Sequence, residues 1–305
     1  MHDRLPNHPE IEFASLGSGS SGNCSLVRSE GTAILVDAGI SCRQIEQRLE
    51  AIGQDPDELH AILLTHEHGD HINGLRVFCK KHPKVLLHAS AGTQRIVAEK
   101  VLDVGQVVSW RVVPTQGTFE VGGFEVTTFR IPHDAVDPLG FLIRSGATSL
   151  GFLTDLGTIT EEIRSRMNGV HGVFVEANYD MAMLEADPKR PWGLKRRIMS
   201  QHGHLSNDQA AAFAVELAEH GLREMICGHL SSDCNCPETA TQTIRKHLDL
   251  CCDPNRPGVR LTISQQTEPT PIRAVRAPGE GPAIEPLLPM FTEDVVRTQS
   301  ELFGA

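Results

Sequence analysis

Short apolar runs with the length of β-strands recur along the first 264 residues, and amphipathic segments separate many of them. Runs of this kind predict strands at 11–16, 24–27, 33–36, 61–64, 85–88, 107–113, 124–131, 140–143, 149–154, 173–175, 224–227 and 259–263. Apolar positions at helical spacing predict helices at 41–51, 91–101, 158–167, 207–219 and 237–248. Gly- and Ser-rich turns between the first three strands indicate an antiparallel meander. Two batches of strands with helices between them predict two sheets packed face to face, with helices outside.

The pattern changes after Ser264, where the chain becomes rich in proline and glycine. We expect one domain over residues 1–264 and a Pro-rich C-terminal arm over 265–305. Residues 291–303 are predicted to form a short terminal helix, and packing against the body is favoured over binding a partner.

Composition narrows the class of protein. The chain has 40% hydrophobic and 22% charged residues, as in ordinary globular proteins. No apolar run approaches the roughly 18 residues that span a bilayer, so no membrane association is expected. The polar N-terminal segment lacks a signal-peptide core, and the eight cysteines are therefore expected to be reduced thiols in the cytoplasm.

The strongest chemical signal is the segment Thr65-His-Glu-His-Gly-Asp-His71, directly after an apolar run. Alternate residues of an extended chain share one side, so His66 and His68 can bind one cation together. Gly69 allows a turn after which Asp70 and His71 can reach a second cation. Imidazole and carboxylate donors without cysteine suit zinc, and also manganese or iron.

Four ligands cannot complete two metal centres, so further donors must lie elsewhere. His133, Asp155 and His229 each follow an apolar run that is predicted to be a strand. A single histidine or aspartate at a strand end is usually a capping or turn residue. Together, however, the three complete two sets of ligands.

These residues, with Asp37 in Val36-Asp-Ala-Gly39, match in order the motifs of the metallo-β-lactamase fold. The resemblance covers about residues 11–264 and implies an α/β protein, an αββα four-layer sandwich with a dinuclear site at one edge. It implies that one metal is held by His66, His68 and His133. The other would be held by Asp70, His71 and His229, and Asp155 would bridge both. Asp37 would orient ligands from behind, although a turn residue before Gly39 is a comparable interpretation.

Finer motifs resemble the YycJ/WalJ group of this superfamily, regarded as metal-dependent exonuclease-like hydrolases of DNA. These motifs are at 16–23, 175–180, 203–207 and 228–231. The chain departs from the group at 232–236, where paired asparagines are usual, and at Tyr179, where a histidine is usual. Glu176, His204 and His229 are also similar in arrangement to residues of tRNA 3′-processing endonucleases, in which a Glu and a His cooperate in phosphodiester cleavage.

The leading hypothesis is therefore a phosphodiesterase with two divalent ions, zinc or manganese, that degrades DNA as a 5′→3′ exonuclease. Asp70, Glu176 and His204 are the candidate catalytic residues: His204 would protonate the leaving alkoxide or contact phosphate, and Glu176 would orient it. The alternative is a small-molecule hydrolase, either a cyclic phosphodiesterase or a thioesterase of the glyoxalase II type. A non-enzymatic binding module is weaker because every ligand is present, and an antibiotic-hydrolysing β-lactamase is disfavoured because no export signal is visible.

The net charge of −11 argues against a broadly positive surface for binding nucleic acid, but not against a local basic groove. The candidate substrate-binding residues are Asn178 and, in the basic cluster 189–197, Lys195 and Arg196. A solvated helix face is the competing interpretation of the cluster.

Two further motifs are rejected. Gly17–Gly22 matches a dinucleotide-binding pattern, but a strand rather than a helix is expected after it, so a tight turn near the site is favoured. The spacing of Cys234, Cys236, Cys251 and Cys252 is not that of a structural zinc site.

Overall fold

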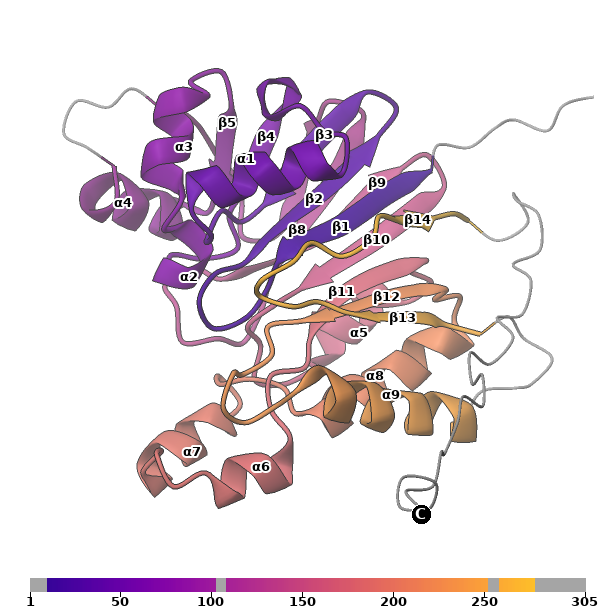
Figure 1. The fold of residues 1–305 in the computed structure, drawn as a ribbon. Coiled ribbons are helices and arrows are strands. Elements are labelled where there is room, and N and C mark those ends of the chain that lie inside the picture. The colour runs from indigo at the N-terminus through magenta and orange to yellow at the C-terminus, as the bar shows by residue number, and fades with distance from the viewer. Residues whose placement is uncertain (1–9, 103–107, 252–257, 278–305) are drawn as a thin grey trace, which may run out of the picture.

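The structure is a computed structural model that describes residues 10–102, 108–251 and 258–277, and it contains two face-to-face β-sheets (Figure 1). Within these residues each sheet has seven strands. The first has the order β14-β1-β2-β3-β4-β5-β6, with bounds β1 Ile11–Gly17, β2 Cys24–Ser29, β3 Thr32–Val36, β4 Ala61–Leu63, β5 Leu86–Ala89, β6 Ser109–Val112 and β14 Arg273–Val275. The second has the order β13-β12-β11-β10-β9-β8-β7, with bounds β7 Gly117–Val121, β8 Phe124–Arg130, β9 Leu139–Ser145, β10 Thr148–Leu153, β11 Gly172–Glu176, β12 Glu224–Gly228 and β13 Arg260–Ile263.

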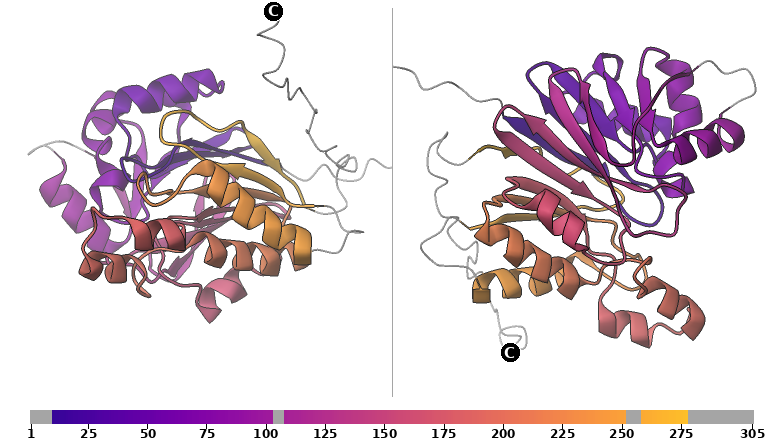
Figure 2. Two further views of the ribbon diagram at one scale, coloured as in Figure 1. Left: turned by 60° about the horizontal axis from the view of Figure 1, so that its bottom comes forward. Right: turned by 180° about the vertical axis from the view of Figure 1, so that it is seen from behind.

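Helices cover the outer face of each sheet, as the two rotated views also show (Figure 2). The first sheet packs against α1 (Cys42–Ala51), α3 (Leu75–Lys81) and α4 (Ala91–Lys100). The second packs against α5 (Glu161–Met167), α8 (Asn207–Glu219) and α9 (Pro237–Cys251). A third apolar cluster lies between the sheets. The predicted αββα sandwich is thus confirmed. The short elements η1 (Pro56–Glu58), α2 (Gly69–Ile72), α6 (Met181–Ala186) and α7 (Trp192–Ile198) lie in the connections.

Local sequence signals explain several of these elements. Ser206 caps α8: its side chain accepts a hydrogen bond from the backbone of Gln209, whose side chain accepts one from the backbone of Ser206. Strands β1, β2 and β3 pair antiparallel, which confirms the expected meander. In the second sheet β10, β11, β12 and β13 run parallel. Parallel strands have their carboxyl ends at the same edge, so the loops that follow them lie close together.

Two strands were not expected from the sequence. The first, β7, pairs with β8. The other, β14, lies within the expected C-terminal arm and pairs antiparallel with β1, where Ile11 is opposite the fully buried Val275. The first sheet therefore includes chain beyond the predicted boundary at Ser264. The helix predicted at 291–303 falls outside the described residues. Among the helices that are described, none has the length and apolar character to cross a bilayer.

Candidate metal centre

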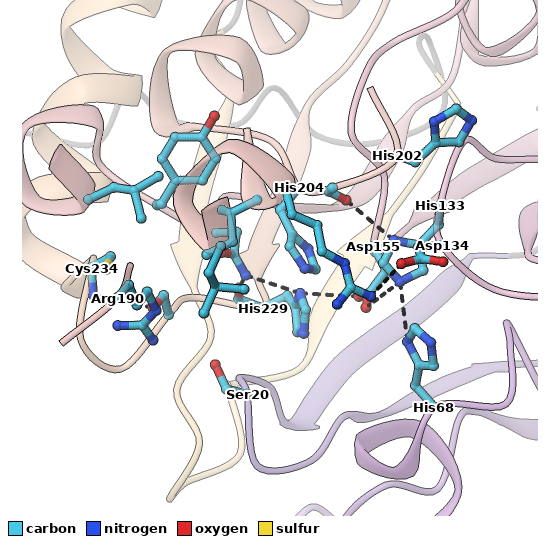
Figure 3. Close-up of a pocket in the computed structure, with 18 of the residues that line it drawn as sticks. Ser20, His68, His133, Asp134, Asp155, Arg190, His202, His204, His229 and Cys234 are labelled. Atoms are coloured by element: carbon cyan, nitrogen blue, oxygen red, sulfur yellow. Dashed lines mark hydrogen bonds and ion pairs between the residues drawn. The ribbon is translucent and has the colours of Figure 1, made fainter. Parts of the chain in front are cut away.

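The candidate site lies where loops leave the carboxyl ends of strands from both sheets (Figure 3). The segment Thr65–His71 follows β4 of the first sheet. His133, Asp155 and His229 follow β8, β10 and β12 of the second sheet. The structure brings all seven proposed ligands together in two groups that share Asp155.

The first group consists of His66, His68, His133 and Asp155, whose donor atoms lie within 4.8 Å of one another. His133 Nε2 is 3.3 Å from His68 Nδ1 and 3.5 Å from Asp155 Oδ2. His66 Nε2 is 3.6 Å from the same carboxylate oxygen. Three imidazoles and one carboxylate oxygen therefore converge on one point, as zinc coordination requires.

The second group consists of Asp70, His71, Asp155 and His229. His71 Nε2 is 3.4 Å from Asp155 Oδ1 and 3.4 Å from Asp70 Oδ2. His229 Nε2 is 3.3 Å from Asp70 Oδ2, and its Nδ1 is 3.1 Å from Asp155 Oδ1. Asp155 thus presents Oδ1 to this group and Oδ2 to the other. A carboxylate in that position can bridge two cations.

Two observations show that divalent metals fit these residues. His66 Nε2 is buried and has no hydrogen-bond partner among the described residues, a costly state that a metal ion would relieve. His71 Nδ1 lies 2.7 Å from Asp37 Oδ2, and the backbone and hydroxyl of Thr65 also donate to Asp37. This contact fixes the proton of His71 on Nδ1 and leaves Nε2 free to coordinate, as a carboxylate behind a ligand histidine commonly does.

Electrostatic coupling pushes the pKa values in the site apart. Burial lowers the pKa of His66 well below 6.5, and the neighbouring His71 lowers it further. For His71 burial acts in the same direction, but Asp155 and Asp37 outweigh it and raise the pKa well above 6.5. Burial would raise the pKa of Asp155, yet His229 and His71 hold it well below its usual range. Such opposed shifts are typical of functional sites.

The backbone at the site is also unusual. Asp37, Asp155 and His229 have φ angles of 60°, 52° and 55°, in the left-handed region. Among the described residues only one other non-glycine residue, Glu30, has a positive φ. This conformation is sparsely populated, and it clusters at functional sites where the surrounding structure enforces it. Asp37 therefore occupies a turn and also contacts His71, so both interpretations of this residue apply.

Glu176 and His204 form a pair beside the two groups. Glu176 is fully buried, and its Oε1 accepts hydrogen bonds from the backbones of Leu156 and Leu205. Its Oε2 lies 3.0 Å from His204 Nδ1 and 3.1 Å from His229 Nδ1. Burial would lower the pKa of His204, but Glu176 raises it. Glu176 thereby favours the protonated form of His204, which lines the pocket.

A polar residue that sequence reasoning missed supports the second group. Asn23 Nδ2 donates to Asp70 Oδ2 at 3.2 Å, and its Oδ1 accepts from Ser18 Oγ at 2.7 Å. Ser18 Oγ in turn accepts from the backbone of His229 at 2.7 Å. The Gly17–Gly22 turn thus lies at the site, and strand β2 follows it, which excludes the dinucleotide interpretation. An asparagine at the end of this Gly/Ser motif was the signal available in the sequence.

The pocket at the site has a volume of about 320 Å³. Asn178 lines it and donates to the backbone carbonyl of His229 at 2.8 Å. The prediction that Lys195 and Arg196 face substrate is not supported, because neither lines the pocket. Lys195 is buried with Nζ on the Glu185 carbonyl, and Arg196 is exposed.

Arg190 and Arg197 line the pocket instead, both from the same basic cluster. The helical period explains the difference on α7. Arg197 and Ile198 lie three and four positions after Leu194 and share its face toward the pocket, whereas Arg196 does not line the pocket. Arg197 pairs with Asp134 at the rim.

Among the residues that the structure describes, Cys234, Cys236 and Cys251 do not come together as a metal site. The seven cysteines in the described part of the chain are all free. Cys234 Sγ is 3.5 Å from Asp187 Oδ2, Cys236 Sγ contacts Thr239, and Cys251 is exposed. Cys252 lies outside the described residues.

Comparisons with known proteins agree with this geometry. A family described as the Beta-lactamase superfamily domain matches residues 32–230. The chain is 32% identical to Exodeoxyribonuclease WalJ of Streptococcus pneumoniae over 78% of its own length and 88% of that protein. It is 30% identical to Exodeoxyribonuclease YycJ of Bacillus anthracis over 78% of its length and 89% of that protein.

Among solved structures, the metallo-β-lactamase fold protein YhfI from Bacillus subtilis superposes with a TM-score of 0.63 at 14% identity. This match covers 86% of the present chain and 99% of YhfI, and it shows the shared fold. Taken with the family match and the two groups of donors at the expected edge of the sandwich, it establishes that the chain belongs to the β-lactamase superfamily and has the fold of its metal-dependent hydrolases.

Proposed function

We propose that this protein is a metal-dependent phosphodiesterase that removes nucleotides from DNA ends in the 5′→3′ direction. The observation that carries the proposal is the carboxylate of Asp155, with one oxygen facing each donor group, next to the Glu176–His204 pair in the same pocket. The similarity to two exodeoxyribonucleases supports DNA as the substrate. The free thiols support a cytoplasmic location.

The proposed ligands follow the two groups. One divalent ion would be held by His66, His68 and His133, and the other by Asp70, His71 and His229, with Asp155 shared. The donor set suits zinc or manganese, and also iron. When bound, two such ions supply a water activated for attack and positive charge for the phosphate oxygens.

The protein's own groups would act on the leaving strand. His204 has Nδ1 fixed by Glu176, so its Nε2 is the atom available to give a proton to the departing alkoxide. Glu176 is held by two backbone donors, which prevents it from rotating away from His204. Asn178 and Arg197 line the pocket and would contact the phosphate, Arg197 by exchanging the exposed carboxylate of Asp134 for it.

The test is digestion of end-labelled single- and double-stranded DNA with added Mn²⁺ or Zn²⁺. Wild type is expected to release nucleotides from the 5′ end, and a 5′-terminal phosphorothioate is expected to block the reaction. Asp70→Ala is expected to abolish it, while Asp249→Ala, an exposed carboxylate on α9, is the matched control. No cleavage by wild type, or full activity in Asp70→Ala, refutes the proposal.

A small-molecule hydrolase is the second candidate, and the pocket volume favours it. About 320 Å³ lies at the lower end of the range for pockets that bind small ligands. Cyclic nucleotides and glyoxalase II-type thioesters are the substrate classes to examine. Turnover of either class at a kcat/KM well above that for DNA would favour this alternative.

A further inference from the structure

The pocket has two chemically different ends. At one end lie the histidine and aspartate donors, among them His68 and His133. Arg190 and Cys234 lie at the opposite side of the same pocket in Figure 3. The lining of the pocket also includes Leu184, Leu194 and Ile198, from α6 and α7, and these three form what we term the apolar wall. Leu184 packs in a small cluster with Cys234 and Tyr179, and Ile198 lies against that cluster.

The charges near the apolar wall are already paired. Arg190 contacts Asp187 and Asp233, and Lys189 Nζ lies 2.7 Å from Asp233. Two cations and two carboxylates therefore neutralise one another. In sequence, Leu184 lies between Asp180, which caps α6, and Asp187 of this ion-pair group. This end of the pocket consequently lacks free positive charge for a phosphate and suits an uncharged, largely apolar group.

A nucleotide has the same division of chemistry. Its phosphate is anionic, whereas its deoxyribose and base are uncharged and have apolar faces. At about 320 Å³ the pocket lies at the lower end of the range for sites that hold one small ligand, so we take a single nucleoside, and not a base pair, as its occupant. Leu194 is 39% exposed, so the apolar wall is reachable from solvent.

We propose that the apolar wall receives the base and sugar of the terminal nucleotide while its phosphodiester lies at the donor end. The inference rests on the proposed function and adds a specificity to it: the strand end must be unpaired before it enters. Leu194 is then a specificity-determining residue, since it contacts the base and not the reacting atoms. A blunt duplex is expected to be cleaved only as fast as its end frays.

The experiment compares two single strands that differ only in the terminal residue, one normal and one abasic. Wild type is expected to cleave the normal strand on the order of 10-fold faster in kcat/KM, the usual effect of losing one apolar group from a pocket. Leu194→Asn is expected to remove most of this preference by slowing only the normal strand. Leu250→Asn, on a 75% exposed leucine of α9, is the matched control and should keep the preference. Thermal unfolding checks that both variants fold.

The outcomes separate the two proposals. Cleavage of neither strand by wild type overturns the proposed function and this inference with it. Equal cleavage of both strands by wild type overturns the inference alone. A Leu194→Asn variant that slows both strands equally also overturns it, because the leucine would then act without reference to the base.

Discussion

Glu224 offers a test of the fold's energetics that does not depend on the metal centre. It begins β12, is almost completely buried, and its Oε1 lies 3.1 Å from the guanidinium of Arg260. Its Oε2 has no hydrogen-bond partner among the described residues. Burial raises the pKa of Glu224 from 4.5 to about 7, although Arg260 and Arg273 act in the opposite direction. The proposed perturbation is Glu224→Gln, which keeps the size and removes the charge.

The magnitude follows from proton linkage. Between pH 4.5 and pH 7 the folded state binds more protons than the unfolded state, so stability falls as pH rises. With a folded pKa of about 7, the carboxylate costs about 1.4 kcal/mol at pH 5.5 and about 3.3 kcal/mol at pH 8. The side-chain amide of the Glu224→Gln variant cannot ionise and avoids this cost. The stability gained by the variant should therefore grow by about 2 kcal/mol between the two pH values.

Urea unfolding of wild type and variant at both pH values, with identical metal content, measures this difference. The change in the gain between the two pH values is the informative quantity, because any pH-independent effect of the substitution cancels. Glu120→Gln, an exposed residue of β7, is the matched control and should show almost no change at either pH. A gain that is equal at both pH values would show that folding does not raise the pKa of Glu224, and a loss that grows with pH would show that Glu224 is stabilised as an ion pair.

Three further predictions concern single side chains. Asn23→Ala should weaken one of two metal-binding steps by about 10- to 100-fold, because Asn23 holds Asp70 in place. Titration against a chelator measures the two affinities, and an equal loss at both steps would contradict the prediction. His204→Asn should lower kcat about 10²- to 10⁴-fold with unchanged metal content, and loss of metal would instead make His204 a ligand. His88 is buried, both ring nitrogens lack partners in the described structure, and burial lowers its pKa to about 4. As pH falls below 6.5, the histidine of the unfolded chain is protonated before that of the folded chain, so the free energy of unfolding decreases. His88→Leu should reduce this decrease by about 3 kcal/mol, and an unchanged pH dependence of the free energy of unfolding would contradict the prediction.

Much of the fold could be predicted because its elements carry local signals. The helix α8 has an N-cap serine and a period of apolar alanines, and its predicted bounds agree with the structure. In contrast, β14 is three residues long and is stabilised by pairing with β1, some 260 residues away in sequence. Nothing local distinguishes such a segment from a Pro-rich linker. Its place in the sheet depends on tertiary contact alone.

The candidate site divides in the same way. The donors could be predicted because they are histidines and aspartates that lie shortly after strands or, for Asp70 and His71, in the turn that follows, and the strands are visible in the sequence as apolar runs. The cations that line the pocket could not be predicted, because charge alone does not tell which face of α7 a residue occupies. Lys195 shows this: its ammonium group bonds a backbone carbonyl inside the protein, although its sequence context is that of a solvated basic cluster.

Glycines beside the donors explain how loops from distant parts of the chain come close enough to build one site. A Cβ on Gly39 would overlap the carbonyl of Asp70, and the backbone of Asn23 donates to that carbonyl at 2.7 Å. A Cβ on Gly228 would lie 2.6 Å from Ser18 Oγ, the acceptor of the His229 backbone. The loops that position Asp70 and His229 are therefore packed against the same turn at distances that no larger residue permits. In the sequence, the residues that support the donors from behind are therefore marked by glycines close to the donors and not by further charged residues.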